Sequence, residues 1–302
     1  MIHNKVIELV KGNWRSIIFM LFTRYLGWLP DEYYLRGVFR IMMGYRLNLK
    51  NPKTFNEKIQ WLKLNDRNSL YTSLVDKYEV KSQIANLIGE DYIIPTLGVW
   101  DRPEDIDWDS LPDQFVLKTT HGGGNLGVVI CKSKQEINKQ EICDRLRNSL
   151  QQDIYKLFCE WPYKNVKRRI IAEKLMMQED GTALADYKFF CFNGKPEYIY
   201  LRHEEKNESK PRLSFITMDW QFAPFYNPGY SQFESIPPKP VLFEEMKCIA
   251  EKLSKGHSFL RVDLYIINNH VYFSELTFYP SSGMRPFEPV EWDKKLGDLI
   301  KL

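Results

Sequence analysis

The sequence predicts an α/β protein of the α+β kind, in which a helical N-terminal region precedes sheets made mainly of hairpins. Residues 1–75 carry helix-start signals and apolar positions at helical spacing. Asn193-Gly194 lies between two segments of alternating apolar residues, which is the strongest short-range signal for a hairpin. A second pair of apolar strands spans residues 259–277. The 302 residues suffice for one large domain or for two or three small ones.

The composition argues against several classes of function. A formal net charge of +3 over 302 residues gives no reason to expect a nucleic-acid groove. The five cysteines form no C-x-x-C pair, which fits reduced thiols in a cytosolic protein better than a disulfide framework or a zinc site. The N-terminal residues do not resemble a secretory signal, so we expect a cytoplasmic protein.

Ser16 to Leu29 is the most apolar early stretch. It is too short, and too interrupted by Arg24, to span a bilayer. Two interpretations remain. An amphipathic helix could rest on the inner face of the membrane, a role that suits Trp14, Trp28, Arg15 and Arg24. A helix that packs on the main domain is the favoured interpretation.

Three helix starts follow along the chain. Pro30-Asp31-Glu32 places proline and acids in a first turn. Thr54 and Glu57 have the spacing of a capping box. Asp76 can cap a helix that ends near Gly89, which puts Lys77 in the first turn. A cation is unfavourable there unless it faces an anion, so Lys77 hints at a phosphate site. When Lys77 is considered alone, the favoured interpretation is an ordinary solvated lysine.

A glycine-rich loop then joins two strands. After a strand at 92–100 and a connection at 101–113, residues 114–120 form a strand with Lys118 in its interior. The loop His121 to Gly127 leads to a strand at 128–131. Strand, loop and strand make a hairpin, which argues against a Rossmann fingerprint, and no P-loop motif is present. Consecutive glycines still let backbone N–H groups fold over an anion, beside the positive charge of Lys118.

The remaining elements alternate between helix and hairpin. The pattern predicts helices at 133–158, with a break, and at 243–254, and strands at 168–175, 186–192, 195–202 and 213–218. Asp186 and Lys188 share one face of their strand.

The hairpin at 259–277 contains two carboxylates, Asp263 and Glu275, and Arg261 shares the face of Asp263. A two-residue turn would place the carboxylates on opposite faces, whereas a three-residue loop at 268–270 would set them across from each other. We predict the three-residue loop. Facing carboxylates repel unless a cation lies between them, and oxygen ligands of this kind suit Mg²⁺. The alternative is an exposed hairpin with unrelated charges.

In combination, these motifs resemble the ATP-grasp superfamily of carboxylate–amine ligases. The similarity rests on Asp76-Lys77 with Lys81, on Val116 to Lys118 with the loop 121–127, and on Arg261 to Asp263 with residues 273–277 and 282–284. The chain is most similar to the TupA-like branch, tied to teichuronopeptide and capsular polysaccharide synthesis, through residues 51–58, 118–124, 186–189 and 193–195. The motifs are specific as an ordered set.

The resemblance implies an ATP-grasp fold whose two α+β subdomains, 76–172 and 173–302, clamp ATP after the helical region 1–75. It also implies ATP and Mg²⁺ as cofactors and gives the following residues roles. Lys77, Lys118 and Lys188 bind ATP; His121, Gly122, Gly123 and Gly124 form a lid; Glu173, Lys174 and Leu175 form the adenine hinge; Asp186 binds ribose; Asp263 and Glu275 bind Mg²⁺; Arg261 and Lys118 are catalytic; and Arg202, Ser282, Gly283 and Arg285 bind substrate. Lys188, Arg202 and Arg285 are three unranked candidates for holding the acid.

By this resemblance the protein would join a small-molecule amine, an amino acid, to a uronic acid of a surface glycan through an acyl phosphate. Thr277 stands where the superfamily usually has a third metal ligand, Asn, and the loop 275–283 is longer than usual. A non-catalytic ATP-binding module therefore remains an alternative. Another is a glycosyltransferase, since Asp105-Ile-Asp107-Trp-Asp109 contains D-x-D triplets, which we interpret as turn residues.

Overall fold

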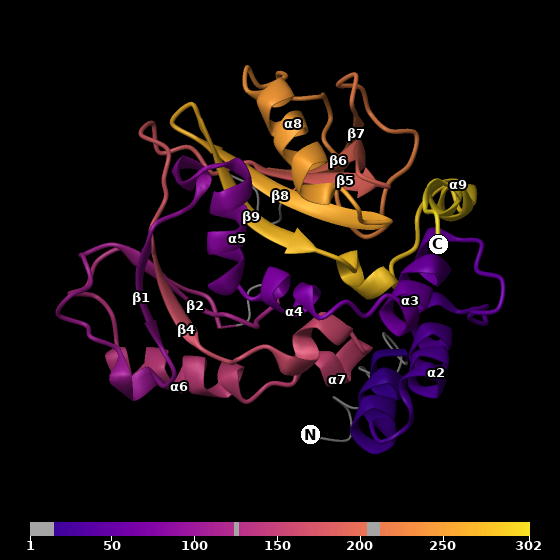
Figure 1. The fold of residues 1–302 in the computed structure, drawn as a ribbon, viewed down its shortest axis with the longest axis horizontal. Coiled ribbons are helices and arrows are strands. Elements are labelled where there is room, and N and C mark those ends of the chain that lie inside the picture. The colour runs from indigo at the N-terminus through magenta and orange to yellow at the C-terminus, as the bar shows by residue number, and fades with distance from the viewer. Residues whose placement is uncertain (1–14, 124–126, 204–211) are drawn as a thin grey trace, which may run out of the picture.

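The computed structural model describes residues 15–123, 127–203 and 212–302 of the chain. Two antiparallel sheets form the body of the molecule, and the helices of the N-terminal region lie together at one end (Figure 1). Gly124 of the predicted lid lies outside the described residues.

The first sheet has four strands in the order β1-β4-β2-β3. These are β1 Thr96–Trp100, β2 Phe115–Thr119, β3 Val129–Cys131 and β4 Ile170–Lys174. Alternation along β2 buries Phe115 and Leu117 against Leu146 of α6 (Lys139–Leu150). Lys118 therefore projects from the opposite face. Three short helices flank this sheet: η2 Pro103–Asp105, α7 Ile154–Phe158 and η3 Trp161–Asn165.

The second sheet has five strands in the order β7-β6-β5-β8-β9. These are β5 Asp186–Phe192, β6 Lys195–His203, β7 Arg212–Thr217, β8 Phe259–Ile267 and β9 His270–Thr277. Helix α8 (Phe243–Ser254) covers one face, where Phe189 and Val262 are fully buried with Met246. Because side chains alternate, Lys188 and Asp263 lie on the other face, toward the first sheet.

Helices from both ends of the chain meet beside the second sheet (Figure 1). Residues 15–26 are helical, and α2 (Asp31–Met43), α3 (Phe55–Asn65) and α4 (Leu70–Val75) follow. α5 (Glu79–Ile88) and η1 (Glu90–Tyr92) lead into β1. α3 packs against η4 (Pro280–Gly283) and α9 (Glu291–Leu299), so the N-terminal region is joined to the C-terminal end of the chain.

Most of the predicted local signals are confirmed. Thr54 and Glu57 form a capping box at the start of α3. Asn193 and Gly194 both have positive φ, at 49° and 79°, as the turn between β5 and β6 requires. The helix predicted at 133–158 does break, into α6 and α7. The subdomain boundary predicted between residues 172 and 173 falls inside β4, a strand of the first sheet.

The predicted three-residue loop between the last two strands is wrong. β8 and β9 are joined by the two-residue turn Asn268-Asn269, whose φ angles are 50° and 57°. Asp263 nevertheless pairs with Glu275, because the register shifts between Asp263 and Leu264, which pairs with Phe273. Ser274 is thus the extra residue of a β-bulge, and the bulge restores the alignment that the short turn alone would have lost.

Candidate nucleotide and substrate site

A cavity of about 230 Å³ lies between the two sheets. Its lining comes from both sheets and from the segment before α5, and most of the side chains are charged. The residues are Lys77, Lys118, Val128, Glu173, Asp186, Lys188, Arg202, Tyr265, Ser274 and Glu275. The fold therefore brings together side chains up to almost two hundred residues apart in the sequence, among them five of the eleven predicted ATP-binding residues.

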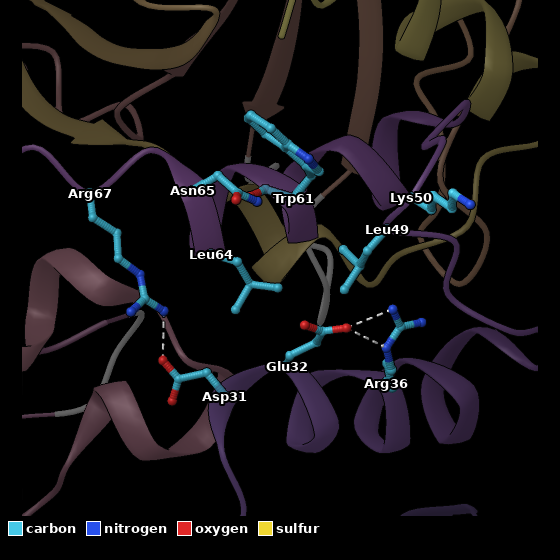
Figure 2. A pocket seen from close by; sticks show the side chains of 9 residues that line it. All are labelled: Asp31, Glu32, Arg36, Leu49, Lys50, Trp61, Leu64, Asn65 and Arg67. Carbon is cyan, nitrogen blue, oxygen red and sulfur yellow. Dashed lines mark hydrogen bonds and ion pairs between the residues drawn. The ribbon is translucent and has the colours of Figure 1, made fainter.

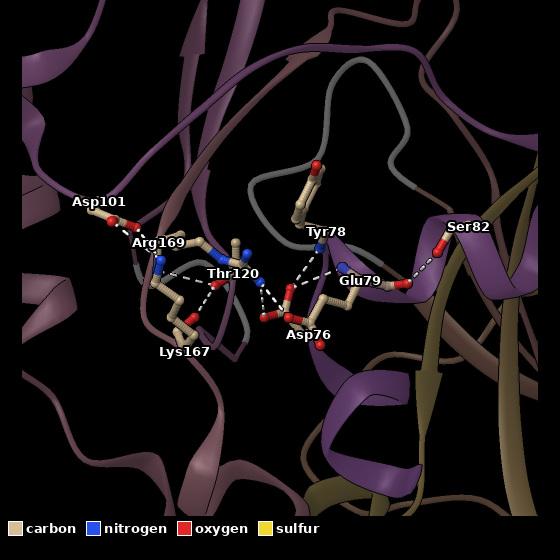
Figure 3. A network of polar contacts seen from close by, with 8 residues as sticks. All are labelled: Asp76, Tyr78, Glu79, Ser82, Asp101, Thr120, Lys167 and Arg169. Carbon is tan, nitrogen blue, oxygen red and sulfur yellow. Dashed lines mark hydrogen bonds and ion pairs between the residues drawn. The ribbon is translucent and has the colours of Figure 1, made fainter.

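An ion pair between Asp76 and Arg169 fixes the backbone next to Lys77 (Figure 3). Asp76 is buried, caps α5 by accepting hydrogen bonds from the N–H groups of Tyr78 and Glu79, and pairs with Arg169 at 3.0 Å. Thr120 then links the two segments, since its carbonyl accepts from the Lys77 N–H at 3.0 Å and its N–H donates to the Arg169 carbonyl at 2.9 Å. Lys77 thus lies just before α5 rather than in its first turn.

The ammonium group of Lys77 donates to the carbonyl oxygen of Gly122, so it contacts the glycine loop directly. Burial lowers the pKa of Lys77, although Glu275 across the cavity opposes the shift. His121 is almost fully buried, with Nε2 3.3 Å from the Gln152 carbonyl oxygen, and does not line the cavity. Burial lowers its pKa. His121 therefore supports the base of the loop, while Gly123 is exposed.

Glu173 is the counter-ion of two lysines rather than a free hinge residue. Its carboxylate lies 2.6 Å from Lys118 Nζ and 2.5 Å from Lys81 Nζ. Burial alone would raise the pKa of Glu173, but the two ammonium groups outweigh burial and hold that pKa below its ordinary value. Next along β4, the Lys174 N–H donates to the Pro95 carbonyl at 3.0 Å, so this N–H of the predicted hinge is already engaged. Leu175 follows directly after β4.

Arg261 lies between the two facing carboxylates of β8 and β9. Its Nε and Nη2 each donate to Asp263 at 2.6 Å, and Nη2 also donates to Glu275 at 2.8 Å. Lys188 on β5 donates to Asp263 at 2.8 Å and also pairs with Asp186. Burial would raise the pKa of Asp263, yet Arg261 and Lys188 hold it below its ordinary value.

The arrangement fits a bound cation, because both carboxylates converge on one positively charged atom, Arg261 Nη2. Asp186 adds a buried oxygen, Oδ1, that has no hydrogen-bond partner in the described part of the chain. The pKa of Asp186 is raised, first by burial and then by the charge of Asp263. Within residues 15–123, 127–203 and 212–302, no group of three acidic, His or Cys side chains forms a metal cage. Mg²⁺ usually needs only one or two carboxylates and completes its shell with water and phosphate.

The structure separates the three candidates for holding an acid. Lys188 and Arg202 line the large cavity. Arg285 instead lines a second cavity, of about 20 Å³, into which Arg261 also faces. Ser282 and Gly283 line neither cavity: their carbonyl oxygens accept hydrogen bonds from Gln60 of α3 at 2.9 and 2.8 Å, so they hold η4 in place.

Sequence reasoning missed several cavity residues. Tyr265 shares the face of Arg261 and Asp263 by simple alternation, so that signal was available. Ser274 reaches the cavity only through the bulge, and Val128 is the residue directly before β3. The D-x-D triplets lie elsewhere: Asp105 pairs with Arg102 at 2.6 Å, and Asp107 accepts from the N–H groups of Asp109 and Ser110. They are turn residues, as predicted.

A further groove on the described surface, about 570 Å³, lies between α2 and α3 (Figure 2). Four of its five charged side chains form ion pairs within the protein: Asp31 pairs with Arg67 at 2.6 Å, and Glu32 pairs with Arg36 at 2.7 Å. None of its lining residues belongs to the cavity between the sheets.

Residues 57–301 match the family described as TupA-like ATPgrasp. A comparison with curated proteins found no match. Among solved structures, the D-alanine–D-alanine ligase of Bacillus anthracis is 17% identical with a TM-score of 0.42, and the match covers 75% of this chain and 65% of that enzyme. The Helicobacter pylori enzyme is 17% identical, with a TM-score of 0.37 and coverage of 76% and 61%. ATP-grasp ligase PsnB, complexed with minimal precursor, is 8% identical, with a TM-score of 0.42 and coverage of 80% and 66%.

The chain thus spans less than two thirds of the length of the two D-alanine–D-alanine ligases. The family match covers far more than half of the chain and includes every described residue of the cavity between the sheets. The protein belongs to the TupA-like ATP-grasp family.

Proposed function

We propose that the protein is an ATP-dependent ligase that joins a carboxylate to an amine and releases ADP and phosphate. The observation that carries this proposal is the cavity itself: Lys77 and Lys118 from one sheet, and Lys188 and Arg202 from the other, converge with Glu275. Four cations around one small cavity suit a polyanion such as a triphosphate, because the negative charge of the polyanion must be neutralised in a partly dehydrated cleft.

In the proposed reaction, a carboxylate oxygen attacks the γ-phosphorus of ATP and ADP leaves, which gives an acyl phosphate. The amine nitrogen then attacks the acyl carbon, phosphate leaves and the amine loses a proton. No protein nucleophile is needed, so the chain's task is to hold the reactants in line and to neutralise charge. Mg²⁺, held by Asp263 and Glu275, would supply further neutralisation of the phosphoryl oxygens.

The residues divide this work by position. Lys77 and Lys118 project from the first sheet and its connections, so we assign them to the phosphates. Arg261 faces the smaller cavity and donates to Glu275, which lines the larger one, so it is placed to contact the group that passes from ATP to the acid. Arg285 faces the smaller cavity and is the best placed of the three candidates to bind the acid. From the family name we further propose a uronic acid of a surface polysaccharide as the acid and an amino acid as the amine.

A cavity of 230 Å³ is smaller than the roughly 300–1,000 Å³ typical of ligand pockets. Lys77 closes it by its bond to Gly122. We therefore expect the glycine loop to move aside when ATP enters.

The test is a screen of phosphate release from ATP over amino acids and uronic-acid acceptors, with ADP and AMP separated. Turnover that needs both the acid and the amine, with ADP as product, supports the proposal. Glu275→Gln should abolish turnover while leaving the fold intact, because the Glu275 side chain is part-exposed. Asp263→Ala is less suitable, because it would remove the buried counter-ion that Lys188 and Arg261 share. Release of AMP, or amide formation without ATP, would contradict the proposal. ATP binding without turnover for any acid–amine pair would instead indicate a non-catalytic module.

A further inference from the structure

The helix at residues 15–26 presents an apolar stripe to solvent. Ile18, Leu21, Tyr25 and Trp28 are 41, 46, 63 and 75% exposed. Ile18, Leu21 and Tyr25 are spaced three and four residues apart, which places them on one side of the helix, and Trp28 lies in the turn directly after it. Such a row of large apolar side chains is unfavourable in water unless something covers it.

The other side of the same helix holds it on the protein. Phe19 stacks on Phe158 of α7, and Phe22 packs on Tyr34 of α2, each pair with ring centroids 5.5 Å apart. The phenyl ring of Phe22 also fills the space beside Gly37. The helix therefore packs on the domain, the interpretation that the sequence favoured, and its second apolar side faces outward.

The exposed apolar residues are concentrated in this region. Of the 19 exposed large hydrophobic side chains in the described residues, seven lie between Ile18 and Met42. Two of these seven, Tyr33 and Met42, belong to α2. The other 12 are spread over the described residues between Leu70 and Leu302.

The charge of the same region selects the partner. Residues 15–28 contain the cations Arg15 and Arg24 and no acid. Arg24 stands 5.8 Å from the centre of the Tyr25 ring, beside the stripe. Cations next to exposed Trp, Tyr and aliphatic side chains are the features by which a helix lies in the interface of an anionic bilayer. Tyr and Trp prefer that depth, because one end of each ring system is polar.

We propose that this helix docks the protein on an anionic membrane surface, with Ile18, Leu21, Tyr25 and Trp28 in the interface and the neighbouring cations at the lipid headgroups. The contact is peripheral, since no helix in the described ranges has the length and apolar character needed to cross a bilayer. The proposal does not depend on the ligase chemistry, because no stripe residue lines either cavity of the site.

The test is cosedimentation of the full-length protein with vesicles of phosphatidylcholine containing phosphatidylglycerol, and with vesicles of phosphatidylcholine alone. We expect binding to the anionic vesicles that weakens with salt. The double variant Leu21→Gln, Trp28→Gln should weaken binding about tenfold or more, since each burial of a large apolar side chain is worth at least that factor. Arg24→Gln should weaken it about fivefold.

The matched control is Val241→Gln, Val290→Gln, which removes two side chains that are 91 and 79% exposed but lie outside the stripe. It should bind as the wild type does, and all variants should unfold at the same denaturant concentration. Failure of the wild type to bind either vesicle would overturn the proposal, as would equal binding by the stripe variant. A dimer in light scattering that the stripe variant disperses would show that a second copy covers the stripe instead.

Discussion

Asp263 and Glu275 face each other across β8 and β9, yet they are held in different ways. Asp263 is fully buried and accepts hydrogen bonds from both Arg261 and Lys188. The Glu275 side chain is 41% exposed and accepts from Arg261 and, at 3.4 Å, from Thr277. Of the two paired carboxylates, the one on β8 therefore has a structural role, whereas the one on β9 is freer.

The two carboxylates should accordingly differ in their effect on stability. Asp263→Ala removes the fully buried counter-ion that Arg261 and Lys188 share, so we expect it to lower the free energy of unfolding by about 3–5 kcal/mol. Glu275→Gln keeps the shape of the side chain at a part-exposed pair and should cost less than about 1 kcal/mol. Urea unfolding of both variants checks this difference. Equal losses would mean that Arg261 does not depend on Asp263 for its neutralisation.

Lys77 should make nucleotide binding sensitive to alkaline pH. Its pKa is lowered by burial in the free protein, and a bound phosphate would favour the charged form. As pH rises through the lowered pKa, binding must also take up a proton, so the Kd for ATP should increase by up to about tenfold per pH unit. Calorimetry in buffers of different ionisation enthalpy should detect that proton. Lys77→Arg, which stays charged, should lose this alkaline weakening, and an unchanged pH profile in that variant would assign the titration to another group.

At the scale of elements, the hairpin of β8 and β9 shows what the sequence can and cannot predict. Alternation correctly placed Arg261 and Asp263 on one face. The turn was predicted with one residue too many, because nothing in a single sequence marks Ser274 as a bulge. A bulge is decided by how β9 packs against its neighbours, and Glu275 reaches its place opposite Asp263 only through that packing.

The turn itself gives a small, clean prediction. Asn269 has a φ of 57°, a conformation that glycine adopts without steric cost. Asn269→Gly should therefore raise the free energy of unfolding by about 0.5 kcal/mol, since Asn-Gly is the preferred pair for this kind of turn. Asn269→Ala should lower it by about 1 kcal/mol. Thermal unfolding of both variants measures how much the positive φ of Asn269 costs the turn.

The segment that presents Lys77 depends on Arg169, which the sequence gave no reason to select. Arg169→Met would leave the buried carboxylate of Asp76 without its cation, and we expect both a loss of stability and at least about tenfold weaker ATP binding. Glu79→Gln is the matched control, because Glu79 pairs with the same guanidinium at 2.8 Å from an exposed position. Arg169→Lys should recover part of the ATP affinity. A variant that loses stability but keeps ATP affinity would limit Arg169 to a structural role.

At the scale of the whole molecule, the sequence predicted the order of elements better than their assembly. Helix starts, hairpins and the glycine loop follow from local rules that a few residues satisfy. The sequence treated residues 1–75 as a separate helical region, yet α3 packs on η4 and α9 from the far end of the chain. Contacts of this kind between distant segments do not change the hydrophobic periodicity of either segment, so the local sequence does not predict them.

Lys63 is the residue that makes this assembly testable. Lys63 is fully buried in α3. Its ammonium group donates to the carbonyl of Phe158, the last residue of α7, at 3.0 Å and to the Ser282 carbonyl in η4 at 2.8 Å. Burial lowers its pKa from 10.5 to about 8, against the opposing charge of Glu160. Between these two values the unfolded chain binds more protons than the folded protein, so this lysine makes stability rise with pH across that window.

Lys63→Met should reveal both effects. Loss of the donor removes a hydrogen bond from the Phe158 carbonyl and one of the two that the Ser282 carbonyl accepts, so the variant should be less stable than the wild type by about 1–3 kcal/mol near pH 7. The difference should widen from pH 8 to 10, by up to about 1.4 kcal/mol per unit, because only the wild type gains stability as the lysine loses its proton. Urea unfolding of both proteins at several pH values measures the difference. A constant difference across that range would mean that Lys63 titrates normally and that solvent reaches the junction of α3, α7 and η4.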